Sequence, residues 1–142
     1  MPSYRMLSLV ATAGALLALG TAQVVAHGDV TPQPVDTTGL EPLGESWREE
    51  NPYRENARAL EIGASGYNQN CARCHGLEVI SGGLAPDLRY LEKGRTGDEW
   101  YMERVRRGAT INGDTKMPGF EGLLSQEAMW AIRTFIESRF DG

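Results

Sequence analysis

The stretch "NQNCARCHG", residues 68–76, holds both cysteines of the chain and one of its two histidines within five consecutive positions. The other histidine, His27, lies far upstream in this chain of 142 residues. So compact a group of cysteine and histidine side chains is typical of a site that holds a metal or a metal-containing group. We therefore expect the rest of the chain to fold around whatever this segment binds.

The spacing Cys-x-x-Cys-His is the one by which haem is attached covalently to a chain. It predicts that Cys71 and Cys74 form thioethers to the haem vinyl groups and that His75 is one axial ligand of the iron. One haem would then supply much of the core that a short, loop-rich chain lacks. The alternatives are a simple disulfide, a thioredoxin-like redox pair and a zinc site. The redox pair needs a βαβ pattern that this sequence lacks, and zinc needs four ligands, which are scarce here.

The sixth iron position decides the chemistry, and its candidates are Met102, Met117, Met129 and His27. Met102 and Met129 fall in segments with helical patterning, where methionine commonly fills a core. His27 would require the N-terminal arm to fold back over the haem. In "NGDTKMPGF", residues 112–120, Pro118 favours an extended backbone at Met117, which suits a side chain reaching the iron. The alternative is that Met117 only fills a gap. With His75 and Met117 as ligands, the iron has no open site for oxygen chemistry.

From Asn51 onward the patterns are helical. The "NP" at 51–52 offers an N-cap followed by proline, and a first apolar face follows, with Gly63 and Gly66 on or beside it. A second helix begins at "TGDE", 96–99, where Thr96 and Glu99 have capping-box spacing, and it ends near Gly108. A third follows Ser125. The apolar residues expected on these helices are Ala57, Leu60, Ala64 and Tyr67; Trp100, Tyr101 and Val105; and Met129, Ile132, Phe135 and Ile136, with Phe140 beyond.

No segment alternates convincingly as a strand, and the segments 76–95 and 109–124 are expected to be loops. The predicted fold class is all-α, with large loops that enclose the haem. The two glycines of the first helix predict that another element packs closely against it, because glycine otherwise only weakens a helix.

The first 26 residues form a separate unit. Arg5 is followed by the uncharged apolar stretch "MLSLVATAGALLALG" and by "VVA" at 24–26, a pattern that predicts a secretory signal peptide. The alternative is an N-terminal anchor that stays uncleaved. Removing this segment takes one of the 14 basic residues, which leaves 13 against 19 acidic ones, a net charge of −6. Such a charge disfavours binding to nucleic acids and to anionic membranes. Residues 27–50, rich in proline, are expected to be an extended arm before a domain at 51–142.

Four motifs in combination resemble a class I c-type cytochrome: "CARCHG" (71–76), "APDL" (85–88), "KMPGF" (116–120) and the final "WAIRTFIESRF" (130–140). The similarity spans about residues 54–140. It implies that the first and last helices cross, with Gly63 meeting the aromatic Phe135 and Trp130 nearby. It also implies that the carbonyl of Pro86 meets the second ring nitrogen of His75, which would fix the imidazole. Trp100 and Tyr101 are possible donors to a haem propionate, although core filling explains them equally well.

The arm together with residues 63–91 resembles the soluble c-550 type, which accepts electrons from pyrroloquinoline-quinone-dependent alcohol dehydrogenases in the bacterial periplasm. The resemblance implies a monomeric periplasmic one-electron carrier, not an enzyme, that passes electrons to a terminal oxidase or another cytochrome. The alternatives are a haem enzyme or gas sensor with a labile sixth ligand, and a different periplasmic dehydrogenase or reductase as partner. Basic residues near the haem motifs, namely Arg73, Arg89, Lys93, Arg95 and Lys116, would steer an acidic donor, unless they are an ordinary solvated mix of charges.

Overall fold

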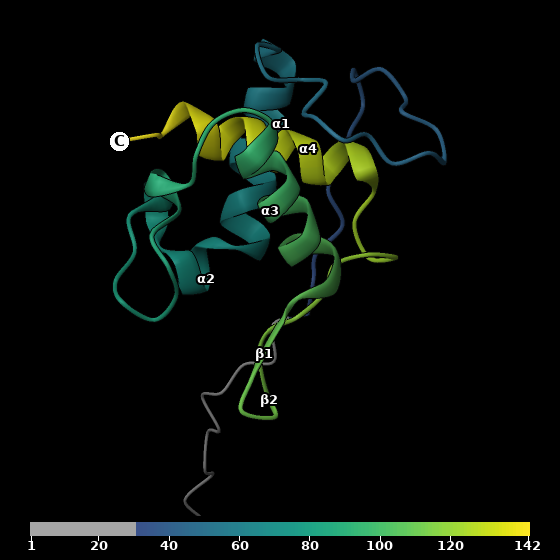
Figure 1. The fold of residues 1–142 in the computed structure, drawn as a ribbon. Helices are drawn as coiled ribbons and strands as arrows, with labels where there is room; N and C mark the ends of the chain where they lie inside the picture. Colours follow the sequence, from purple (N-terminus) through teal and green to yellow (C-terminus); the bar gives the residue numbers. More distant parts are fainter. Residues whose placement is uncertain (1–30) are drawn as a thin grey trace, which may run out of the picture.

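The computed structural model describes residues 31–142, in which α-helices dominate (Figure 1). The predicted signal peptide and His27 therefore lie outside the described residues. No helix within the described range is long and apolar enough to cross a membrane. The elements, in chain order, are α1 Ala57–Asn70, α2 Ala72–His75, the short 3-10 turns Leu77–Val79 and Leu88–Tyr90, α3 Arg95–Arg107, β1 Ala109–Ile111, β2 Asp114–Met117 and α4 Gln126–Ser138.

Helices α1 and α4 cross at the centre of the molecule (Figure 1). At the crossing, a Cβ placed on Gly63 would lie 1.9 Å from the carbonyl oxygen of Ala131, so only glycine allows this approach. One turn further along α1, the rings of Tyr67 and Phe135 meet with their centroids 5.3 Å apart. The crossing predicted from the resemblance is present. The atoms of α4 nearest to Gly63 are backbone atoms of Ala131 and Ile132, and the ring of Phe135 contacts that of Tyr67.

The apolar face of α1 differs from the predicted one. Its buried residues are Ala59, Ile62, Gly63, Gly66, Tyr67 and Asn70. Of the predicted set, Ala57 is exposed and Leu60 is 38% exposed, while Tyr67 is buried. The predicted position of Gly63 and Gly66 on or beside this face, with another element packed closely against them, is confirmed, because both are buried against α4.

Two predicted helix starts are also corrected. Helix α1 begins after Asn56, whose side chain accepts a hydrogen bond from the N–H of Ala59, and the Asn51–Pro52 pair precedes it in a turn. Helix α3 begins after Gly94 with no side-chain cap, so the capping box expected at Thr96 is not formed. The start of α4 is as predicted, because the Ser125 side chain accepts a hydrogen bond from the N–H of Ala128. Phe140 lies beyond the end of α4.

A β-hairpin occupies part of the segment predicted to be a loop. Strands β1 and β2 pair antiparallel, with Thr110 opposite Thr115 and Ile111 opposite Asp114. The turn between them is Asn112–Gly113, and both residues have positive φ, at 53° and 85°. This is the conformation of the two-residue hairpin turn that favours Asn-Gly. The Asn112–Gly113 dipeptide is therefore a sequence signal for a β-hairpin, although the residues on either side of it do not alternate between apolar and polar.

Residues 31–50 have no helix or strand, as predicted for the arm, but they are bonded to the helices. Gln33 exchanges hydrogen bonds with Asn70 of α1, at 2.7 and 3.1 Å. The N–H of Leu43 donates to Glu127 of α4 at 2.8 Å, and the Leu43 side chain is buried. This part of the arm thus contributes to the core.

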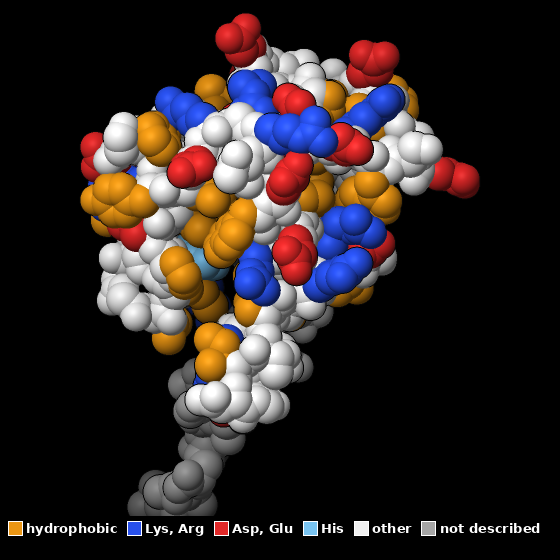
Figure 2. Space-filling model, in the orientation of Figure 1, with side chains coloured by type: hydrophobic (Ala, Val, Ile, Leu, Met, Phe, Trp, Pro, Cys, Tyr) orange, Lys and Arg blue, Asp and Glu red, His pale blue; other side chains and the backbone are white. Residues whose placement is uncertain are grey.

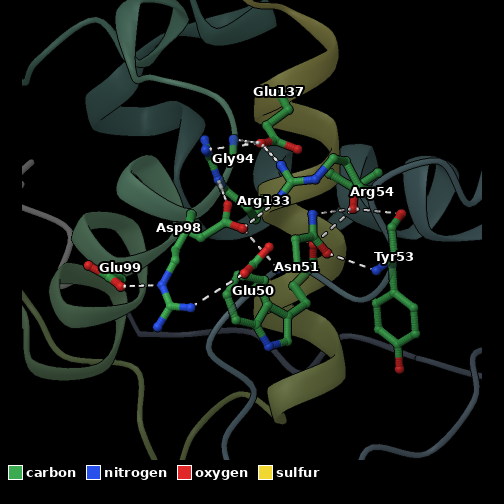
Figure 3. Close-up of polar contacts among 12 residues, drawn as sticks. Glu50, Asn51, Tyr53, Arg54, Gly94, Asp98, Glu99, Arg133 and Glu137 are labelled. Carbon is green, nitrogen blue, oxygen red and sulfur yellow. Dashed lines mark hydrogen bonds and ion pairs between the residues drawn. The ribbon is translucent and has the colours of Figure 1, made fainter.

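A buried ionic network fixes the start of α3 against α4 (Figure 3). Arg133 and Asp98 are both fully buried, and Arg133 Nε donates to Asp98 Oδ1 at 2.8 Å. The other carboxylate oxygen of Asp98 accepts from Arg54 at 2.5 Å and from the N–H of Asn51 at 2.9 Å. Glu137 pairs with both arginines. Two positive and two negative charges therefore balance within the network, as buried charges require.

Candidate functional site

The predicted haem-attachment residues lie on a single turn of chain. The N–H of Cys71 caps the end of α1 by donating to Tyr67 O at 2.8 Å. The carbonyl of Cys71 then accepts from the N–H groups of Cys74 and His75, at 3.1 and 3.0 Å. Residues three apart on a helical turn share a face, so the two thiols lie on the same side. The structure therefore brings Cys71, Cys74 and His75 together.

The turn is closed by a glycine and a tyrosine. Gly76 has φ +84°, and a Cβ there would lie 1.8 Å from the carbonyl oxygen of Ile80, so a side chain is excluded on both grounds. The hydroxyl of Tyr67 donates to the carbonyl of Gly76 at 2.9 Å. Sequence reasoning assigned Tyr67 only to the apolar face of the first helix and missed this bond, because its partner is a backbone atom.

The orientation of His75 is set by Pro86. His75 Nδ1 lies 2.9 Å from the carbonyl oxygen of Pro86. A carbonyl can only accept, so this contact places the proton on Nδ1 and leaves Nε2 free to bind a metal. This is the position that the resemblance implies for Pro86.

The loop that carries Pro86 is itself fixed by Asp87. The carboxylate of Asp87 accepts from the N–H of Ser81 at 3.3 Å and from the N–H and guanidinium of Arg89, at 2.8 to 3.0 Å. These hydrogen bonds, with that of the Arg89 side chain first, lower the pKa of Asp87 to about 2. The carboxylate is therefore charged at neutral pH and holds the segment next to Pro86 in place.

Met117 is the last residue of β2, where it is half-buried and packs against the core. The segment after it is held on the end of α3. The N–H of Phe120 donates to Val105 O at 2.8 Å, and a Cβ on Gly108 would lie 2.3 Å from Met117 O. Backbone contacts of this kind fix the Met117 main chain. The other methionines considered, Met102 and Met129, are buried in the core at 6% and 0% exposure.

The two aromatic residues of α3 differ in their availability to a haem propionate. The hydroxyl of Tyr101 is buried and donates to Met129 O at 2.8 Å. The hydroxyl proton is used in this hydrogen bond, so Tyr101 cannot donate it to a haem propionate. Trp100 is 43% exposed and remains free to donate.

The surroundings of the cysteines fit a haem. Among the large hydrophobic side chains, Leu77, Ile80 and Leu84 are 73%, 53% and 77% exposed, and all three follow His75 within nine residues. Figure 2 shows hydrophobic side chains gathered around a pale-blue histidine, at a hollow of the surface between α2, α3 and the hairpin. A flat apolar group bonded to Cys71 and Cys74 would cover such side chains, whose exposure to water is otherwise unfavourable.

The alternatives to haem fit less well. Both cysteines are free, which is not a structural disulfide. Burial of its sulfur, with a further effect of Cys74, raises the pKa of the Cys71 thiol to about 12, whereas a redox-active pair needs a thiolate. Within residues 31–142, no three His, Cys, Asp or Glu side chains are grouped to hold a metal ion, as zinc would require.

The predicted basic set is largely neutralised by ion pairs within the chain. Arg89 pairs with Asp87 and Asp141, Arg95 with three glutamates, and Lys116 with Asp114. The ammonium of Lys93 lies 4.7 Å from the ring centroid of Phe140. Arg73 is exposed. These residues are therefore better described as an ordinary mix of surface charges than as a set of free cations that would steer an acidic donor.

Sequence comparison places these features in a family. Residues 58–136 match the family model described as Cytochrome C oxidase, cbb3-type, subunit III. The chain is 62% identical to cytochrome c550 of Pseudomonas aeruginosa over 118 residues, which cover 80% of this chain and 81% of that protein. It is also 35% identical to quinohemoprotein alcohol dehydrogenase ADH IIB of Pseudomonas putida over 80 residues, which are 56% of this chain and 11% of that enzyme.

Structural comparison agrees on the fold. Cytochrome cL of the marine methylotroph Methylophaga aminisulfidivorans superposes with a TM-score of 0.53, at 22% identity and with 73% of each chain covered. The predicted cytochrome c fold is thereby confirmed, with the small hairpin added to its helices. The chain belongs to the cytochrome c family, and as a member it is an electron-transfer protein with covalently bound haem c rather than an enzyme.

Proposed function

We propose that this protein is a periplasmic electron carrier that accepts electrons from a pyrroloquinoline-quinone-dependent alcohol dehydrogenase. It would pass them singly to a terminal oxidase or to another cytochrome. Haem c, when bound, supplies one-electron redox chemistry. Oxidation of one alcohol releases two electrons, so two molecules of the carrier are needed for each alcohol oxidised.

The residues that hold the haem are part of this proposal. Cys71 and Cys74 would provide the thioether sulfurs, and His75 Nε2 and Met117 Sδ would bind the iron. The observation that carries the assignment is the 2.9 Å contact of His75 Nδ1 with Pro86 O, because it leaves Nε2 as the free nitrogen on the turn that carries both thiols. Occupation of both axial positions excludes oxygen or peroxide from the iron and favours electron transfer over catalysis.

The choice of donor rests on the match to a quinohemoprotein alcohol dehydrogenase. The matching segment is 11% of that enzyme, which therefore carries in its own chain a segment related to this protein. A separate chain of the same kind can serve a dehydrogenase that lacks such a segment. The acidic net charge of −5 is consistent with a protein that does not bind to nucleic acid or to an anionic membrane surface.

The periplasmic location rests on the N-terminal sequence. Residues 1–26 have the charge and apolar stretch of a secretory signal, and we propose that cleavage leaves a monomeric carrier that begins at His27. Haem with thioether bonds also requires both thiols to be reduced when the bonds form, and both cysteines are free here. Mass spectrometry of the protein purified from the periplasm tests the cleavage, because an uncleaved anchor would leave the full chain in the membrane fraction.

The function is tested by a pyridine-haemochrome spectrum and by rapid mixing. The spectrum should show one haem c per chain, and a Cys71→Ala/Cys74→Ala variant should retain none after denaturation. When quinoprotein alcohol dehydrogenase reduced with ethanol is mixed with the wild-type protein in a stopped-flow instrument, it should reduce the haem, and it should continue to do so over many turnovers of the enzyme. Rapid binding of carbon monoxide to the reduced wild-type protein would instead support a gas sensor or a haem enzyme with a labile sixth ligand.

A further inference from the structure

One face of α3 carries an aromatic and cationic surface, of which only Trp100 is also a candidate donor to a haem propionate. It consists of Trp100, Arg104 and Arg107, which we name the α3 surface. Spacings of four and three residues place these side chains on one side of the helix. The guanidinium carbon of Arg104 lies 5.7 Å from the centroid of the Trp100 ring, in a cation–π contact, and Arg107 is exposed.

The two arginines of this surface differ from most other arginines of α3 and its neighbourhood. Neither forms an ion pair with any residue in the range 31–142, whereas Arg95 pairs with three glutamates and Arg106 donates twice to Glu121, at 3.1 and 2.8 Å. Glu103, three residues after Trp100 and four before Arg107, lies on the same face and is exposed, but it is not within ion-pair distance of either arginine. Two unpaired cations side by side are notable in a chain whose net charge is −5.

The α3 surface lies next to the haem site. Trp100 precedes Tyr101, a buried member of the core cluster against which Cys71 packs. At the other end, Arg107 is followed by Gly108 and the hairpin that carries Met117. In Figure 2, hydrophobic and Lys/Arg side chains lie over α3 beside the hollow, with Asp/Glu side chains among them. A protein that covered this surface would therefore come close to the haem edge.

We propose that the α3 surface docks an acidic patch on the protein that reduces the haem, an inference that rests on the proposed function. Tryptophan and arginine are the side chains most enriched at interface hot spots, and a guanidinium without an internal partner can bind a carboxylate through two parallel hydrogen bonds. Long-range attraction to the two unpaired cations would steer the donor. A second copy of this chain is a poor occupant, because a two-fold contact through this surface would bring the arginines of both copies together.

The test is charge reversal of the two arginines in the haem-loaded protein. Stopped-flow reduction by ethanol-reduced quinoprotein alcohol dehydrogenase gives the second-order rate constant for wild type and for Arg104→Glu/Arg107→Glu. At an ionic strength of about 0.01 M we expect the rate constant of the double variant to fall about tenfold, and at about 1 M, where charges are screened beyond ~3 Å, less than twofold. Equal rate constants for variant and wild type at low salt would overturn the docking surface while leaving the proposed donor intact.

Arg58→Glu/Arg95→Glu is the matched control. It changes the net charge by the same amount at Arg58 in α1 and Arg95 at the start of α3, exposed residues that pair with glutamates and do not belong to the α3 surface, and it should lower the rate constant much less. An equal loss in both double variants would show an effect of net charge alone and overturn the inference. Reduction by ascorbate should not differ among the proteins, and a parallel loss there would mean an altered haem rather than lost docking. If the dehydrogenase fails to reduce even the wild-type protein, the proposed donor and the inference both fail.

Discussion

The substitution Gly63→Ala should disrupt the crossing of α1 and α4. A Cβ at this position would lie 1.9 Å from Ala131 O and 2.5 Å from Ala131 C, whereas ordinary contacts begin at 3.4 Å. The helices would have to separate by about 1.5 Å at their closest point, since both atoms belong to the backbone and cannot rotate away.

The magnitude follows from two opposing effects. Alanine stabilises a helix interior by about 1 kcal/mol relative to glycine, and overpacking of this kind costs about 3 kcal/mol or more when backbone must move. The net loss in the free energy of unfolding should be about 2 kcal/mol or greater, which lowers the melting temperature of a domain of this size by about 8 °C.

Two other glycines provide graded controls. A Cβ on Gly66 would meet only side-chain atoms, those of Ile132 and Val35 at 3.1 to 3.3 Å, and these can shift by a few tenths of an ångström. Gly82 has nothing within 4 Å, so Gly82→Ala should be neutral or stabilise by about 0.4–1 kcal/mol. The assay is guanidinium unfolding of the haem-loaded proteins, followed by far-ultraviolet circular dichroism. If Gly63→Ala unfolds at the same midpoint as Gly82→Ala, the reasoning from the helix crossing is wrong.

Three further predictions concern the iron, the Pro86 loop and the arm. Met117→Ala should lower the reduction potential and let carbon monoxide bind the reduced protein, whereas Met129→Ala should cost about 2–5 kcal/mol of stability and leave the iron closed; carbon monoxide titrations of both variants decide between them. Asp87 has a pKa depressed from 3.8 to about 2, chiefly by Arg89, so its stabilising effect is complete above pH ~4 and is lost as the pH falls through ~2. Asp87→Asn should therefore be less stable than wild type at pH 7 and equally stable near pH 2, by unfolding midpoints, and a constant difference would contradict this. Leu43→Ala, in the arm, should cost about 2–3 kcal/mol, and an unchanged midpoint would show that the arm does not belong to the core.

The sequence was most informative where chemistry restricts it. The thioether and ligand residues in "CARCHG" need a fixed spacing, so five positions predicted a haem, while the helical patterning after Asn51 predicted the fold class. The start of α4 was predictable because Ser125 caps it with its own side chain. Each of these features is encoded within a few residues of the place where it acts.

Features that depend on distant residues were missed. Helix α1 begins after Asn56 rather than at the predicted Asn51. Asn51 instead donates hydrogen bonds to distant residues, from its N–H to Asp98 and from its side-chain amide to Thr134. The buried face of α1 was misplaced because it is chosen by the backbone of Ala131 on α4. Long-range contacts routinely override local patterns in this way.

The ionic network gives these distant contacts a role in the haem site. Asp98 lies in the first turn of α3 and is bonded to Arg133 of α4, so that end of α3 cannot move independently of the α1–α4 pair. The other end of α3 accepts the backbone bond from Phe120, three residues after Met117. Helix α3 thus connects a fixed ionic anchor to the loop of the proposed axial ligand. Because a helix is rigid over 13 residues, the position of Met117 is set in part by charges buried at the opposite end of the helix.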